Sequence, residues 1–132
     1  MIRWGKRGLA LFTDELRIVE IMGEAYFYLD DYDSSLRYMQ RYTSSVSQGG
    51  QASIAYFFMA EVYRLRGQFY HADIAYSTAV RLTPGNSLWW YRMGLVREAL
   101  GDFAYAVTAF ERALAINPNY TQARDGLARS RR

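Results

Sequence analysis

The feature that most constrains this chain is an internal repeat with a period of 34 residues. When residues 53–86 are laid over residues 87–120, nine positions are identical. The identical pairs are Ser53/Ser87, Met59/Met93, Val62/Val96, Gly67/Gly101, Phe69/Phe103, Ala72/Ala106, Ala75/Ala109, Ala79/Ala113 and Pro84/Pro118. A fixed period of this length indicates stacked supersecondary units rather than a single closed core.

Within each unit the apolar spacing is helical. Tyr56, Met59, Ala60 and Tyr63 fall at offsets of 0, 3, 4 and 7 residues, which predicts that they form the core face of one helix. The repeated glycines suit a left-handed turn after that helix, and the repeated prolines end the second helix of each pair. No segment shows a sustained strand-like alternation, so we expect an all-α fold.

These positions resemble the tetratricopeptide repeat family, whose unit is a helix–turn–helix of 34 residues. Residues 87–120 match best, at Trp90, Met93, Gly94, Gly101, Asp102, Phe103, Ala106, Phe110, Ala113 and Pro118. Residues 53–86 match at Tyr56, Met59, Ala60, Tyr63, Gly67, Phe69, Ala72, Tyr76, Ala79 and Pro84. The resemblance implies a right-handed superhelical solenoid of about three units with a C-terminal capping helix.

On this interpretation the chain divides into five consecutive segments. They are a leader (residues 1–15), a degenerate first repeat with a Gly/Ser linker (16–52), a second repeat (53–86), a third repeat (87–120) and a capping helix (121–132). In the degenerate repeat Asp30 replaces the turn glycine. Tyr42 fills a slot sized for alanine, which should push the helices apart or reroute their contact. We expect Asn119 or Thr121 to cap the last helix.

The resemblance implies that partners bind in a concave groove lined by the first helix of each unit. Helical spacing identifies the residues that share this face, away from the core. The predicted groove residues are Arg17, Glu20, Glu24, Phe27, Tyr28, Ile54, Phe57, Glu61, Arg64, Leu65, Leu88, Tyr91, Leu95, Glu98, Asp125 and Arg129. Half of them are apolar, and five acids against three arginines give a net charge of −2. We therefore expect a protein or peptide partner, amphipathic or extended, with apolar anchors and some basic residues.

The composition argues against catalysis. The chain has no cysteine and a single histidine, His71, so the sequence excludes thiolate chemistry and Cys/His zinc sites. The acidic residues from Asp30 to Asp33 resemble the start of a calcium loop, but Leu36 and Tyr42 stand where that loop needs glycine and glutamate. We expect no catalytic residue, no metal and no cofactor, and we interpret the chain as a non-enzyme.

The positive charge of the chain lies at its two ends. Residues 1–7 and 124–132 each carry +3, whereas residues 8–123 carry −3. Nucleic-acid binders gather basic residues on a folded face, so we expect no nucleic-acid partner. The apolar part of residues 1–12 is too short for a signal peptide or a membrane span. We expect a cytoplasmic location, or alternatively the soluble part of a larger or exported protein.

Two alternatives to peptide binding stay open at this point. A second copy could cover the apolar face, making the chain a self-assembling structural module or a fragment of a longer repeat array. Residues 1–12 could also fill the groove themselves. Family members that grip acidic chaperone tails use a clamp of Lys, Arg and Asn. Here Glu20, Glu24 and Leu88 occupy clamp slots and only Arg92 matches, so we expect a different adaptor, scaffold or chaperone-like role.

Overall fold

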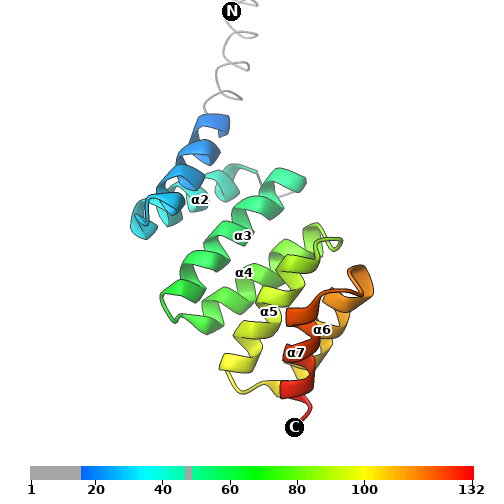
Figure 1. Ribbon diagram of the computed structural model, residues 1–132. Coiled ribbons are helices and arrows are strands. Elements are labelled where there is room, and N and C mark those ends of the chain that lie inside the picture. Colours follow the sequence, from blue (N-terminus) through cyan, green and yellow to red (C-terminus); the bar gives the residue numbers. More distant parts are fainter. Residues whose placement is uncertain (1–15, 47–48) are drawn as a thin grey trace, which may run out of the picture.

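The computed structural model describes residues 16–46 and 49–132, and every regular element among them is a helix (Figure 1). Residues 16–28 are helical and are referred to below as the first helix. It is followed by α2 (Tyr32–Ser45), α3 (Gly50–Leu65), α4 (Phe69–Leu82), α5 (Ser87–Ala99), α6 (Phe103–Ile116) and α7 (Thr121–Ser130). The helices stack as antiparallel pairs along one direction, so the fold is an all-α repeat solenoid (Figure 1).

The turns inside the pairs follow the sequence pattern. Gly67 and Gly101 have φ values of +74° and +79°, the left-handed conformation that glycine adopts at little cost. Asp30 takes the equivalent place in the first pair with φ of +61°, which costs a residue with a side chain more. Asp31 then caps α2, since its side chain accepts a hydrogen bond from the Ser34 N–H.

Small residues let the helices of each pair come close. A Cβ atom built on Gly94 of α5 would lie 2.6 Å from the ring of Phe110 in α6. In the first pair a Cβ on Gly23 would lie 2.7 Å from the Met39 side chain of α2. The Ser35 hydroxyl, buried beside this contact, donates a hydrogen bond of 2.7 Å to the Gly23 carbonyl. The tight crossing thus occurs in the first and third pairs, filled by a methionine in one and by a phenyl ring in the other.

The structure corrects two expectations about local packing. On α3, Met59 and Ala60 are buried as expected, but Tyr56 and Tyr63 are only half-buried while Phe58 is buried. Phe58 is buried because rings of the first helix cover it, and a helical pattern within α3 could not show that. At α7 the capping position is Tyr120, whose side chain makes no capping bond; Asn117 instead accepts from the Asn119 N–H.

The core consists of two clusters of buried side chains. The larger extends from Val19 and Met39 through α3 and α4 to Met93 of α5. The smaller surrounds Phe110 and includes Ala123 of the last helix. Tyr42 is buried and lines a hollow of about 260 Å³ with Arg17, Glu20, Ile21 and Gln51. No helix within the described residues is long and apolar enough to cross a membrane.

Candidate functional site

The predicted groove residues come from the first helix, α3, α5 and α7. We call these four the inner helices and the surface that the predicted residues share the inner face. Ring contacts connect neighbouring helices along it. The ring centroids of Phe27 in the first helix and Phe58 in α3 are 5.2 Å apart. Phe57 of α3 stacks on Trp89 of α5, with ring centroids 5.1 Å apart and an angle of 16° between the ring planes. Tyr91 of α5 lies 5.0 Å from Tyr120, which precedes α7. The inner helices are therefore fixed to one another by aromatic side chains.

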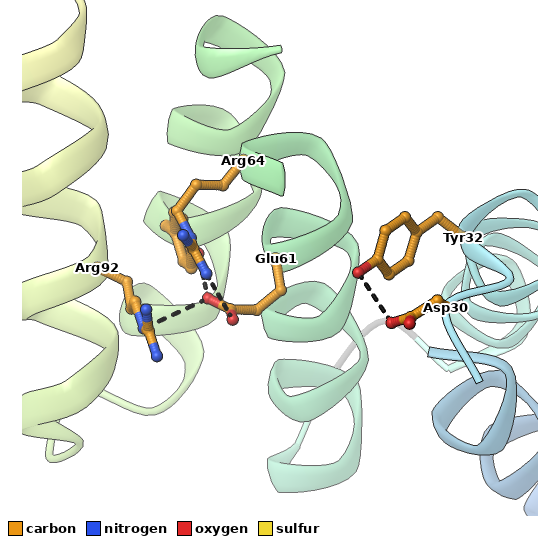
Figure 2. A network of polar contacts seen from close by, with 6 residues as sticks. Asp30, Tyr32, Glu61, Arg64 and Arg92 are labelled. Carbon is orange, nitrogen blue, oxygen red and sulfur yellow. Dashed lines mark hydrogen bonds and ion pairs between the residues drawn. The ribbon is translucent and has the colours of Figure 1, made fainter. Parts of the chain in front are cut away.

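A buried carboxylate lies at the centre of the inner face. Glu61 of α3 is 6% exposed and accepts hydrogen bonds from the Tyr76 hydroxyl of α4 and from Nη2 of Arg64, the latter at 3.1 Å. Arg92 of α5 approaches from the other side, with its Nε 3.7 Å from Glu61 Oε1 (Figure 2). Arg64 Nε also donates to the Tyr76 hydroxyl oxygen at 3.2 Å. Three helices thus meet at one charged side chain.

The pKa directions in this network follow from burial and from the carboxylate. Burial and, next, the Glu61 charge raise the pKa of Tyr76 far above its ordinary value, so its hydroxyl remains a donor. Burial lowers the pKa of Arg64, but the attraction of Glu61 and Tyr76 outweighs it and leaves that pKa raised. Glu61 is the common acceptor of this network, and the two arginines compensate its charge.

A second pair of acids lies at the first-helix end of the inner face. Glu20 is half-buried, and burial together with a hydrogen bond and repulsion from Glu24 raises its pKa to about 7. The Glu20 charge also raises the pKa of Tyr42, after the larger effect of burial. Within the part of the chain that the structure describes, the ion pairs found do not include Glu20 or Glu24. This end of the face therefore carries two neighbouring carboxylates, with Arg17 lining the same hollow as Glu20.

The opposite end of the inner face carries paired charges. Arg129 of α7 donates two hydrogen bonds of 2.9 and 3.0 Å to the two carboxylate oxygens of Glu98 in α5. This bidentate geometry is the strongest one between arginine and a carboxylate. The hydrogen bonds to Glu98 raise the pKa of Arg129. Burial lowers it by less, and the Glu98 charge raises it again, so the pKa lies above its ordinary value. The pair joins the last helix to the stack, and Asp125 beside it on α7 is exposed.

The structure places the predicted groove residues in three environments. Tyr28, Leu65, Leu88, Arg17, Asp125 and Arg129 are exposed, and Glu20, Glu24, Phe27, Ile54, Phe57, Arg64, Tyr91, Leu95 and Glu98 are half-buried. Glu61 is buried. Glu61 and Arg64, three residues apart on α3, form an ion pair that belongs to a buried network rather than to the surface.

Sequence reasoning did not include Phe58, Tyr76, Trp89 or Arg92 in the predicted face. Tyr76 and Phe110 occupy the same repeat position, and this pattern indicated a core ring but not a hydroxyl partner for Glu61. Among the described residues no group of three or more His, Cys, Asp or Glu side chains could hold a metal ion. The chemistry on this face is that of apolar contact, hydrogen bonding and charge.

Comparison with known proteins gives a family match and many structural neighbours. The model of the tetratricopeptide repeat family matches residues 87–120. The first TPR of Spaghetti (RPAP3), solved bound to the HSP90 peptide SRMEEVD, superimposes with a TM-score of 0.80 at 21% identity, covering 89% of this chain and 91% of that one. The Arabidopsis OM64 TPR domain gives 0.80 at 18% identity, covering 89% and 95%.

A third neighbour, MamA, gives a TM-score of 0.83 at 18% identity, covering 98% of this chain and 74% of that one. At these identities the likeness establishes a shared fold. No curated protein matches the chain by sequence.

Proposed function

Because the tetratricopeptide repeat model matches residues 87–120 and the whole stack has the fold of such domains, we propose that this chain is a non-catalytic protein-interaction module, an adaptor, scaffold or chaperone-like protein. Its inner face forms a concave groove that binds an amphipathic or extended segment of a partner. The observation that carries this proposal is the exposure of large apolar side chains on three inner helices. Tyr28, Leu65 and Leu88 are 72%, 47% and 37% exposed, in positions where a solvated helix face would be polar.

The charge distribution supports a partner with basic residues. Arg64 and Arg92 flank Glu61, so the central carboxylate is already compensated inside the protein. The negative charge available to a partner is therefore concentrated at Glu20 and Glu24, with Asp125 exposed at the far end. A segment with apolar anchors over the middle of the face and a Lys or Arg near the first helix fits this arrangement.

Acidic peptides fit the same face less well. Two of the similar solved structures contain HSP90 or HSP70 peptides, SRMEEVD and SGPTIEEVD, both rich in carboxylates. In this chain Glu20 and Glu24 would repel such a peptide, and Leu88 offers it no charge. We therefore propose that the groove of this chain selects basic rather than acidic segments.

Peptide titration tests this proposal directly. A fluorescent amphipathic peptide of leucine and lysine should bind at least about tenfold more tightly than a leucine–glutamate peptide of the same pattern, or than SRMEEVD. A tenfold difference in affinity corresponds to about 1.4 kcal/mol. Leu88→Ser should weaken that binding. Ile116→Ser, which removes an exposed apolar side chain of α6 outside the predicted groove, serves as the matched control and should leave it unchanged.

A variant of the acid pair Glu20 and Glu24 tests the expected charge preference in the same peptide titration. Replacing Glu20 and Glu24 by glutamine should lower the affinity for the leucine–lysine peptide and reduce its dependence on salt. Equal binding of all three peptides, or equal losses in Leu88→Ser and Ile116→Ser, would show that the inner face is not the binding surface.

A further inference from the structure

The first helix and α2 form a hollow that lies away from the inner face. It has a volume of about 340 Å³ and is lined by Tyr26 of the first helix and by Ser34, Arg37, Tyr38 and Arg41 of α2. Tyr26 is two residues from both Glu24 and Tyr28, so helical geometry places it nearly opposite these inner-face residues. We call this space the first-pair hollow. Its volume lies in the range that is typical of small-molecule sites.

Two cations of α2 lie side by side at the first-pair hollow. The four α2 residues have the spacing 0, 3, 4 and 7, which places them on one face of the helix. Arg37 and Arg41 are one turn apart on this face and are exposed, and the described residues of the lining include no acid. Like charges at this spacing repel each other and destabilise a helix. An anion held between the two guanidinium groups replaces this repulsion by attraction.

The remaining walls of the first-pair hollow are aromatic and bear hydroxyl groups. The rings of Tyr26 and Tyr38 stack, with centroids 5.5 Å apart and an angle of 19° between the ring planes. These two tyrosines and Ser34 are half-buried. Each of the three side chains carries a hydroxyl group that can donate a hydrogen bond. The hollow therefore combines a flat apolar wall with several donors.

The same place in the second pair has a different chemistry. The first repeat, residues 16–52, is 37 residues long, so adding 37 to a residue number gives the equivalent position in the second repeat. The equivalents of the five lining residues are Tyr63, His71, Ile74, Ala75 and Thr78, and all five line a hollow of about 150 Å³. Ile74 and Thr78 thus stand where the first pair has its two arginines. The hollow recurs with the repeat, but its cationic lining belongs to the first pair.

In the third pair the arginines at these positions are used within the protein. The guanidinium groups of Arg97 and Arg112 each lie 5.7 Å from a ring centroid, that of Tyr105 and that of Trp90 respectively. Arg97 also forms an ion pair with Asp73. Across residues 16–46 and 49–132, the ion pairs and cation–π contacts found do not include Arg37. Its charge is therefore available to a ligand.

The donors of the first-pair hollow match a phosphate group better than a carboxylate. Arginine binds phosphate oxygens through pairs of parallel hydrogen bonds. A phosphate monoester offers three terminal oxygens and a charge of about −1.5 to −2 at pH 7, whereas a carboxylate offers two oxygens and one charge. Two guanidinium groups with hydroxyl donors beside them can satisfy all three oxygens. The stacked tyrosines leave a flat surface for the group that the phosphate esterifies.

We propose that the first-pair hollow binds an aromatic phosphate monoester, with its phosphate on Arg37 and Arg41 and its ring against Tyr26 and Tyr38. Because the lining comes from both helices of the pair, the ligand also holds the first helix on α2. A small molecule and the phosphotyrosine side chain of a partner protein share this chemistry. The site is separate from the inner face, where the proposed groove selects basic segments.

Titration of phenyl phosphate into the full chain tests the proposal, with calorimetry at about 150 mM salt to screen weak surface attraction. Phenyl phosphate should bind saturably, and at least about tenfold more tightly than benzoate or inorganic phosphate. Arg37→Gln should weaken this binding at least about tenfold. The control Arg112→Gln removes the same charge from α6, at the repeat position of Arg41, and should leave the affinity unchanged within about twofold.

A short peptide with one phosphotyrosine separates the two sources of the ligand. If it binds more tightly than phenyl phosphate and loses that affinity in Arg37→Gln, the ligand is a phosphoprotein; equal affinities assign a small molecule. Binding of neither compound, or equal losses in Arg37→Gln and Arg112→Gln, overturns the proposal. Benzoate or inorganic phosphate binding as tightly as phenyl phosphate overturns it as well. Circular dichroism verifies the helices of each variant, and unphosphorylated peptides measure the inner face separately.

Discussion

The two ends of the repeat stack are built on the same plan from different side chains. At the C-terminal end α7 places Gly126 against the ring of Phe110, a Cβ there being only 2.6 Å from it, and joins the stack through the Arg129–Glu98 pair. The outward residues of α7, such as Gln122 and Asp125, are polar and exposed. The first helix instead packs Gly23 on a flexible methionine, and among the described residues its Ile18 and Ile21 are exposed. Within the described residues, the outward side chains are polar on α7 and partly apolar on the first helix.

The largest expected difference between the ends concerns the crossing glycines. Gly94→Ala should destabilise the protein by about 1–3 kcal/mol, because the new methyl group meets a rigid, fully buried phenyl ring. Gly23→Ala should cost less than about 1 kcal/mol, since the end of Met39 can move and alanine favours a helix over glycine. Urea midpoints of the two variants measure the difference. Equal losses would mean that the two crossings are equally rigid.

A smaller effect is expected at the turns. Asp30→Gly should stabilise the first pair by about 0.5–1 kcal/mol, because glycine adopts the φ of +61° without strain. The reverse change, Gly101→Asp in the third pair, should destabilise by a similar amount. Thermal melts of both variants check the opposite signs. If Asp30→Gly lowers the melting temperature, the hydrogen bond from Tyr32 to Asp30 contributes more than the strain costs (Figure 2).

The carboxylates at the two ends should respond oppositely to the same substitution. The pKa of Glu20 is raised from 4.5 to about 7 in the folded protein, so its contribution to stability is complete below pH 4.5 and is lost as the pH rises through 7. Glu20→Gln, which mimics the protonated acid, should therefore be more stable than the parent at pH 8 and equal to it at pH 4.

Glu98→Gln provides the matched variant at the other end. It weakens the ion pair with Arg129 and should lower stability at pH 8 by less than about 1 kcal/mol, since the arginine side chain is about half exposed. Urea unfolding of both variants at the two pH values gives the comparison. A Glu20→Gln variant without any gain at pH 8 would show that the Glu20–Glu24 pair is neutralised in the folded protein.

The sequence predicted the fold well because the information that specifies it is local. Gly67, Gly101 and even Asp30 mark the turns through the backbone conformation that each turn needs. Periodic alanines such as Ala72 and Ala106 mark the close crossings and are fully buried. The packing of Phe58 and the environment of Glu61 were not predicted, because they depend on Phe27 of the first helix and on Tyr76 and Arg92 of later helices.

By itself, then, the sequence determined the repeat period, the all-α class, the order of the helices and the kind of residue at each turn. Each of these depends on residues a few positions apart or on one repeated interval. Only the tertiary structure decided that Glu61 is enclosed by Tyr76, Arg64 and Arg92, that Glu20 and Glu24 share one edge, and that Ile18 and Ile21 lie uncovered. Whether a side chain is buried depends on neighbours far away in the chain, and a helical period specifies a face but not what lies against it.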